Sequence, residues 1–358
     1  MTNNTTPPLI HWRLKFDEEQ IAWLCLDKAD AKVNVLSQSV LEEFETLVTA
    51  LEEHKPSGVV IHSGKPNGFV MGADINEFQK IKTSDQGFKL IRLGHSVADR
   101  LEQLDCSSVA VLNGFALGGG LELALACTHR IAIETDKRII GFPEVQLGLH
   151  PGFGGTVRSV RLAGVRAAMQ LMLTGNPITP KKAYDQGLID KIATSQEWEQ
   201  DARMMLSKRS SRRRAPLIDR ILEQRPFRPL IARTLTKKIA KKVKKAHYPA
   251  PYALIQLWKE HGASKAGYAA EARSFADLMV GSTSRNLVRV FFLQNRLKTQ
   301  GTKTTSNIKH VHVIGAGIMG GDIAAWCALK GLVVTLQDRE LKYIEPALFR
   351  AQKLFAKR

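Results

Sequence analysis

Two glutamates occur in apolar stretches, and each has glycines close by in the sequence. Glu122 follows three glycines in FALGGGLELALAC (115–127), and Glu144 follows a proline in IIGFPEVQLGLHPGFGGTVR (139–158). Burial raises the pKa of a carboxyl, and a second carboxylate nearby raises one of the two further. Two such groups in one pocket can hold a water between them and act as an acid/base pair. The pattern also allows a purely structural role, because Glu is favourable in a first helical turn and three glycines can simply form a turn.

Backbone N–H groups close to these glutamates predict an oxyanion hole. A strand is expected to end near Leu112 and a helix to begin at 119–121, and the first N–H groups of a helix have no acceptor within it. A glycine there lets an anionic oxygen approach closely, because no Cβ intervenes. The stretch GFVMGADINEF (68–78), with Ala73 after Gly72, offers a second donor.

The three stretches resemble the signatures of the enoyl-CoA hydratase/isomerase (crotonase) family. They read GADI, NGFALGGGLE and PEVQLGLHPGFGG, in the family's order. The resemblance covers residues 14 to 192 and implies an α/β fold, a spiral of βα turns with helices packed around it. It implies that the N–H groups of Ala73 and Gly119 hold a thioester oxygen. It also implies that Glu122 activates water for attack at C3 and that Glu144 delivers the proton to C2.

The implied reaction is hydration of trans-2-enoyl-CoA to 3-hydroxyacyl-CoA in fatty-acid β-oxidation, without a metal or other cofactor. The same glutamate pair could also move a double bond between C3 and C2. Met71 is expected to line the acyl pocket, and His150 is expected to be structural or exposed. The coenzyme A contacts that the resemblance implies are Lys32, Asn34, Asp74 and Ile75.

A dinucleotide-binding fingerprint occurs near the end of the chain, in HVHVIGAGIMGGDIAAWCALKGLVVTLQDRE (310–340). Its glycines lie between an expected strand and an expected helix, where Gly315 makes the turn, Gly317 admits a pyrophosphate and Gly320 allows close packing. Asp338, at the end of the second strand, would bond the ribose hydroxyls, which favours NAD over its phosphorylated form. Met319 belongs to the same expected NAD site.

The fingerprint VIGAGIMGGDIA resembles the start of 3-hydroxyacyl-CoA dehydrogenases. A crotonase domain, a helical linker and then this fingerprint is the order found in the multifunctional α subunits of fatty-acid β-oxidation complexes. Those subunits have a thiolase β subunit as partner. Because the dehydrogenase histidine of that family lies well beyond the fingerprint, the chain is expected to be a truncated member. It should lack dehydrogenase activity and bind NAD weakly at best.

Strands and helices alternate in the first half of the sequence, which predicts a layered α/β domain. Strands are expected at 21–27, 58–64, 108–114 and 130–134, and an amphipathic helix at 37–54 with Ser37 or Ser39 as its cap. The segment 202–296 is basic and helical in pattern, and 299–307 reads as a polar linker. The predicted domains are therefore 1–195, a helical linker region 196–307, and 308–358.

Most of the net charge of +18 belongs to one segment, residues 203–245, which contains sixteen Lys or Arg and two acids. Three interpretations stay open for it: a solvated helical linker, a surface for an anionic membrane, or an RNA-binding surface. The last two make a non-catalytic binding protein the alternative to the hydratase. No aromatic and glycine motif accompanies the charge, so nucleic acid is the less favoured partner.

The composition, with 44% hydrophobic and 24% charged residues among 358, is that of a globular protein. No apolar stretch is long enough to cross a bilayer, and the first residues lack the pattern of a secretory signal. The four cysteines are scattered, which indicates core residues rather than disulfides or a metal site. A cytoplasmic, bacterial-type protein that could associate peripherally with a membrane is expected.

Overall fold

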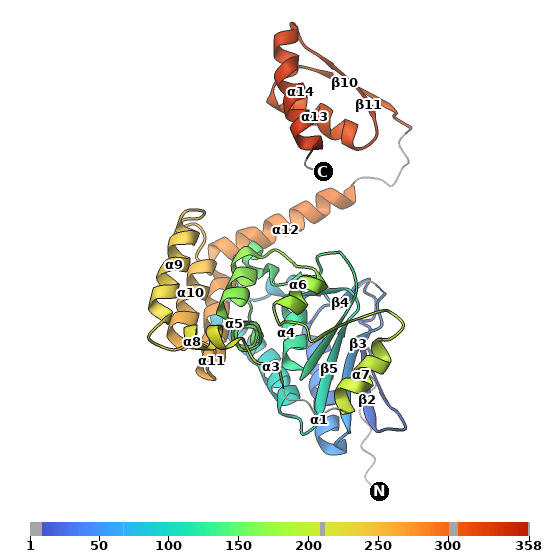
Figure 1. Cartoon of the computed structure of the whole chain (residues 1–358), viewed down its shortest axis with the longest axis vertical. Coiled ribbons are helices and arrows are strands. Elements are labelled where there is room, and N and C mark those ends of the chain that lie inside the picture. The colour runs from blue at the N-terminus through green and yellow to red at the C-terminus, as the bar shows by residue number, and fades with distance from the viewer. Residues whose placement is uncertain (1–8, 67, 208–211, 301–306, 357–358) are drawn as a thin grey trace. The chain divides into compact units, whose positions relative to one another are not determined.

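The computed structural model describes residues 9–66, 68–207, 212–300 and 307–356 (Figure 1). The chain divides into two compact units, Met1–Gln294 and Asn295–Arg358. The division at Gln294 differs from the predicted boundaries at 195 and 307, because the helices after residue 195 pack against strands and helices that precede them.

A six-stranded sheet forms the centre of the first unit, in the order β1-β2-β3-β5-β7-β9. Only β1 and β2 pair antiparallel, and the neighbours from β2 onward pair parallel. Parallel strands of this kind are buried on both faces, which explains their nearly continuous apolar sequences. The strands are β1 (Trp12–Phe16), β2 (Ile21–Leu26), β3 (Gly58–Ser63), β5 (Ser107–Leu112), β7 (His129–Ile133) and β9 (Lys191–Ala193). The four strands expected from the sequence are all present.

A second, three-stranded parallel sheet carries the segments singled out in the sequence. It consists of β4 (Gly68–Val70), β6 (Phe115–Leu117) and β8 (Ile140–Gly141), in the order β4-β6-β8. Each strand is followed at once by one of the glycine-and-acid stretches. Because the carboxyl ends of parallel strands meet at one edge of a sheet, the three stretches converge there.

The helices around these sheets begin and end as local sequence signals predict. Helix α1 (Gln38–His54) is capped by Ser37, one of the two predicted caps, whose hydroxyl accepts a hydrogen bond from the Val40 N–H. Helix α3 (Ser84–Gln103) begins at a capping box formed by Thr83 and Gln86. The remaining helices between strands are α2 (Ile75–Phe78), α4 (Gly119–Ala126), the 3-10 helix η1 (Pro143–Leu147), α5 (Gly155–Thr174) and α6 (Pro180–Asp185).

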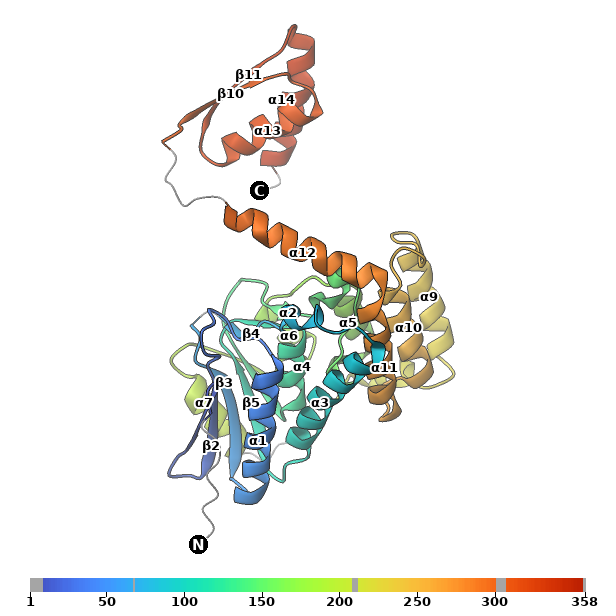
Figure 2. The same cartoon turned by 180° about the vertical axis from the view of Figure 1, so that it is seen from behind.

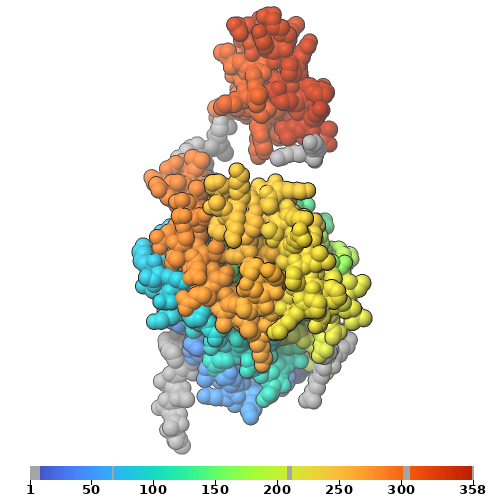
Figure 3. All heavy atoms as spheres, turned by 90° about the vertical axis from the view of Figure 1, so that its left-hand side faces the viewer, coloured from blue at the N-terminus to red at the C-terminus, as the bar shows by residue number. Residues whose placement is uncertain are grey.

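The region after β9 is helical, and its described residues contain no strand before β10. It comprises α7 (Trp198–Ser207), α8 (Leu217–Leu222), α9 (Arg228–Ala240), α10 (Ala250–His261), α11 (Ala266–Val280) and α12 (Ser282–Gln300). Helix α11 lies alongside α3 (Figure 2). In the space-filling view the yellow and orange side chains of this region form a continuous layer over the first unit (Figure 3).

The second unit contains a single βαβ turn followed by another helix in its described residues. Strand β10 (His310–Ile314) pairs parallel with β11 (Val333–Gln337), and α13 (Ile318–Leu329) connects them before α14 (Leu341–Phe355). The predicted polar linker at 299–307 falls mainly outside the described residues, and its first residues belong to α12. The four cysteines are free. Among the described helices, none is long and apolar enough to cross a membrane.

Candidate active site

Glu122 and Glu144, the two glutamates singled out in the sequence, line one cavity of about 290 Å³ in the first unit. Its walls are largely apolar, and Met71 and Ile75 contribute to them from the loop after β4. Phe275 of α11 and Phe291 of α12 also line it. An apolar pocket with a few convergent polar groups is the usual form of a small-molecule site.

Glu122 is fixed in this cavity by the loop that precedes α5. It lies in the first turn of α4 and is 2% exposed, and its Oε1 accepts hydrogen bonds of 2.7 Å from the N–H groups of Phe153 and Gly155. Among the described residues, none donates a hydrogen bond to the second carboxyl oxygen of Glu122, Oε2. Burial raises the pKa of Glu122 well above its usual range, the charges of Glu271 and Glu144 raise it further, and the two N–H groups oppose this rise.

Glu144 lies directly against the glycine turn before α4. It belongs to η1, which follows β8. A Cβ at Gly118 would lie 2.6 Å from its Oε1, and its Oε2 is buried without a hydrogen bond from any described residue. Burial raises the pKa of Glu144 to about 8.

The two carboxyls have unequal hydrogen-bonding surroundings in the cavity. Two backbone N–H groups stabilise the anion of Glu122, whereas the buried Oε2 of Glu144 receives no such bond. Repulsion between the two groups favours one proton on the pair. Burial raises the pKa of both carboxyls, so the pair can share one proton near neutral pH, as an acid/base pair requires.

The N–H groups of Ala73 and Gly119 line the same cavity, and neither has an acceptor among the described residues. Glycines bring the two segments together. A Cβ at Gly72, which has φ +96°, would lie 4.0 Å from the Gly119 nitrogen. At Gly120 a Cβ would meet the Val70 carbonyl oxygen at 2.3 Å, so only glycine allows α4 to pack this closely on β4.

The four residues expected to contact coenzyme A differ in their exposure and in their hydrogen bonds within the fold. Lys32 is exposed, and Ile75 lines the cavity. Asp74 caps α2 by accepting a hydrogen bond from the Asn76 N–H. Asn34 is 1% exposed, and its Nδ2 bonds the Leu26 and Phe69 carbonyl oxygens and the Ser63 hydroxyl. Its amide therefore holds the loop through these bonds, and a contact of Asn34 with coenzyme A stays a prediction.

Met71 is 38% exposed and lines the cavity, as expected. His150 is buried, so of its two expected states only the structural one holds. Its Nε2 bonds the Ser274 hydroxyl of α11 at 2.8 Å, and its Nδ1 bonds the Pro151 carbonyl oxygen at 2.7 Å. The histidine thus ties the loop before α5 to the helical layer.

Sequence reasoning missed Glu271, which is completely buried in α11. It accepts hydrogen bonds from the same loop that holds Glu122, and also from His95 of α3. A signal was available in the sequence. Glu271 falls on the apolar face of its helix, between Tyr268 and Phe275, where a carboxylate is out of place.

The second unit places the predicted fingerprint residues on one turn. A Cβ at Gly315 or Gly317 meets nothing within 4 Å, which leaves the turn open to a ligand, whereas one at Gly320 would lie 1.8 Å from the Gly315 oxygen. The Oδ2 of Asp338 accepts a 2.6 Å hydrogen bond from the Ala316 N–H. Met319 is exposed on the first turn of α13. These residues fit a dinucleotide phosphate at a helix N-terminus, with the acid close by.

Each of the two units is matched by a known protein family. The family described as enoyl-CoA hydratase/isomerase matches residues 17–251, and the one described as 3-hydroxyacyl-CoA dehydrogenase, NAD binding domain, matches residues 310–358. The chain therefore belongs to the enoyl-CoA hydratase/isomerase family, and it carries a segment of a dehydrogenase NAD-binding domain.

One curated relative is the fatty acid oxidation complex subunit alpha of Aliivibrio fischeri, 35% identical over 315 residues. The match covers 86% of this chain and 46% of the relative, so the chain spans about half of that protein's length. Two solved enoyl-CoA hydratases share the fold. That of Bacillus halodurans is 18% identical with a TM-score of 0.57, covering 78% of this chain and 99% of its own. That of Bacillus anthracis is 24% identical with a TM-score of 0.51, covering 81% and 96%.

Proposed function

We propose that the first unit hydrates trans-2-enoyl-CoA thioesters to 3-hydroxyacyl-CoA thioesters in fatty-acid β-oxidation. The observation that carries the proposal is one cavity lined by the carboxyls of Glu122 and Glu144 and by two backbone N–H groups that have no acceptor among the described residues. Family membership and the name of the curated relative support the same reaction class.

The proposed reaction uses each of these groups once. The carboxylate of Glu122 takes a proton from a water as its oxygen attacks C3, and electrons move from the C2=C3 bond toward the thioester carbonyl oxygen. The N–H groups of Ala73 and Gly119 stabilise that oxygen, and each such donor typically contributes a few kcal/mol. The protonated carboxyl of Glu144 then protonates C2. Transfer of a proton between the two carboxyls restores the starting state, so the reaction needs no metal or redox group.

Crotonyl-CoA hydration, followed by the loss of enoyl thioester absorbance, tests this function. Glu122→Gln and Glu144→Gln should each lower kcat by about 10²-fold or more, because each removes a general acid/base. Glu134→Gln, an exposed glutamate away from the cavity, is the control and should retain wild-type activity. A wild-type chain without hydratase activity, or full activity in both cavity variants, would refute the proposal. The same pair could also shift a C3=C4 bond to C2, which a 3-enoyl-CoA substrate would reveal.

For the second unit we propose NAD as the ligand class, held by the glycine turn at 315–320 with Asp338 on the ribose. When bound, NAD accepts a hydride, and we assign no such step to this chain. The support is the open turn over Gly315 and Gly317 and the match to the dehydrogenase domain. We also propose a thiolase β subunit as partner, supported by the curated relative being one subunit of a complex. A cytoplasmic location is a further proposal, and it rests on the resemblance to the β-oxidation α subunits.

The alternative, a protein that binds RNA or a membrane through residues 203–245, gains no support. Several arginines of that segment pair within the fold: Arg203 with Asp17, and Arg212 with Glu102. Lysines such as Lys237 and Lys241 are exposed, as a solvated helical surface would have them.

A further inference from the structure

We propose that Glu271 of α11 is a positioning residue for the hydratase site, holding the loop that orients Glu122; this inference rests on the proposed function. Helix α11 follows the residues 17–251 that match the family. The helical layer would thus complete the site rather than merely connect two domains.

Two carboxylates share the N–H groups of one four-residue segment, Phe153 to Thr156. The N–H groups of Phe153 and Gly155 donate to Glu122, and those of Gly154 and Thr156 donate to Glu271 at 2.6 and 3.0 Å. The Thr156 hydroxyl also donates to Glu271. Because consecutive N–H groups of this segment point in alternating directions, a shift of Glu271 would displace both donors of Glu122.

The segment is also the start of α5, whose cap residue Gly154 has φ +96°. Orphan N–H groups at a helix N-terminus stabilise carboxylates there. Glu271 therefore satisfies donors that would otherwise be buried without partners, a situation costly enough to distort the loop. Without it, the backbone geometry presented to Glu122 would not be maintained.

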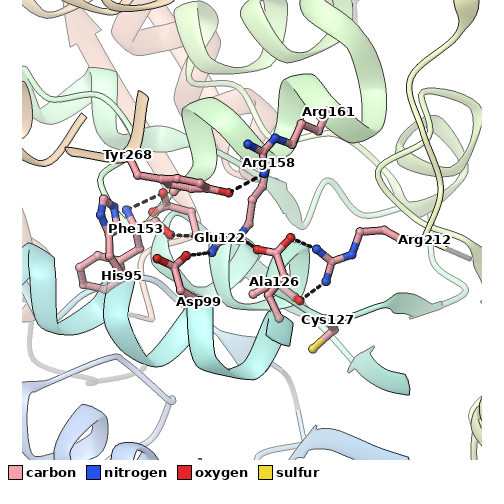
Figure 4. A network of polar contacts seen from close by, with 12 residues as sticks. His95, Asp99, Glu122, Ala126, Cys127, Phe153, Arg158, Arg161, Arg212 and Tyr268 are labelled. Carbon is pink, nitrogen blue, oxygen red and sulfur yellow. Dashed lines mark hydrogen bonds and ion pairs between the residues drawn. The ribbon is translucent and has the colours of Figure 1, made fainter. Parts of the chain in front are cut away.

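Glu271 is itself anchored from α3. His95, which is fully buried, bonds its Oε1 at 3.0 Å. The close-up shows His95 and Asp99 projecting from α3 toward the loop, with Arg158 reaching Asp99 (Figure 4). Arg158 also donates to the Phe153 carbonyl oxygen at 2.9 Å. Charged side chains thus hold the loop through its N–H groups, by Glu271, and through a carbonyl oxygen, by Arg158.

Glu271 also acts on the site electrostatically. Burial is the largest cause of the raised pKa of both Glu122 and Glu144. The negative charge of Glu271 raises both pKa values further. Burial opposes its own ionisation, but the hydrogen bonds and charge of His95 together with the Thr156 hydroxyl lower the pKa of Glu271. The ionisable groups that face it are His95, Glu122, Glu144, His150 and Tyr268, the last with Arg158 over its ring.

The test compares Glu271→Gln with the wild-type chain in crotonyl-CoA hydration across pH. Gln keeps the shape but removes the charge and some of the acceptor capacity. We expect kcat to fall about tenfold or more with KM changed less than about threefold, since misplacement of a catalytic group by a fraction of an ångström is costly. The pH–rate profile should move down by roughly one pH unit, because a like charge is gone.

Asp219→Asn is the matched control. Asp219 is a buried acid of the same helical layer, paired with Arg166 and away from the loop. It should lose stability without a shift of the pH–rate profile. If Glu271→Gln does not fold, as judged by circular dichroism, His95→Phe removes the anchor of Glu271, and a fall of about tenfold in kcat at similar KM is then expected.

A folded Glu271→Gln with wild-type kcat and pH profile would overturn the inference, and so would a folded His95→Phe with both unchanged. An inactive wild-type chain would instead refute the proposed function, so the two failures are distinguishable.

Discussion

The Cα of Gly118 lies so close to Glu144 that a Cβ there would meet the Glu144 Oε1 at 2.6 Å. This turn residue, with φ +50° and ψ −126°, is what allows α4 to begin beside the buried carboxyl. Burial of this carboxyl is the main reason why the pKa of Glu144 rises to about 8. One glycine therefore shapes both the oxyanion segment and the acid.

Replacement of Glu144 should change how stability depends on pH. Its folded-state pKa of about 8 lies above the ordinary 4.5, so its contribution to stability is complete below about pH 4.5 and is lost as pH rises to 8. Glu144→Gln cannot ionise. It should therefore gain stability relative to wild type over this window, by about 2 to 4 kcal/mol at pH 9. Urea unfolding at pH 5, 7 and 9 measures the difference.

Glu53→Gln serves as the control for that series, because Glu53 is exposed at the end of α1. Its stability difference from wild type should be the same at all three pH values. A constant difference for Glu144→Gln as well would show that Glu144 is not held protonated by burial.

Gly118→Ala should damage the site more than the fold. The backbone conformation favours glycine strongly, and the added Cβ would displace the Glu144 carboxyl. We expect a loss of about 1 to 3 kcal/mol in unfolding free energy and a fall in kcat of about 10²-fold. Gly68→Ala is the comparison, since its Cβ would meet only atoms at 3.9 Å. Equal activity of the two variants would contradict the role given to the Gly118 turn.

Asn34→Ala should destabilise the first unit. Its amide joins the Leu26 and Phe69 carbonyl oxygens, and its Oδ1 accepts from the Lys28 N–H at 2.9 Å. Leaving these buried groups unpaired should cost about 2 to 4 kcal/mol in urea unfolding. Asn76→Ala, on an exposed residue, should stay within about 0.5 kcal/mol. A small effect of Asn34→Ala would contradict this structural role of the Asn34 amide.

NAD should bind this chain weakly. Ile318 and Met319, which follow the glycine turn, are 73% and 78% exposed, so the described residues of the second unit would bury little of a ligand's surface. Isothermal calorimetry with NAD is expected to show no binding at micromolar concentrations. A micromolar Kd would contradict this expectation. Asp338→Asn then separates a specific site from nonspecific binding.

The sequence by itself determined the main strands and helices and predicted the two candidate sites. Alternation and apolar runs are local, so the strands at 21–27 and 58–64 and the cap at Ser37 follow from nearby residues. The spacing of glycines and acids around Glu122, Glu144 and Gly315 reflects backbone constraints within a few residues, and these too can be read directly.

Only the tertiary structure decided which distant groups complete the first site. Glu271 reaches Thr156 across 115 residues of sequence, and His95 reaches Glu271 across 176. The free N–H groups of Ala73 and Gly119 meet because two short parallel strands end at the same edge. The burial of Asn34, of His150 and of the Glu144 Oε2 atom likewise depends on what packs over them. Such contacts are properties of the folded surface, and no local pattern specifies them.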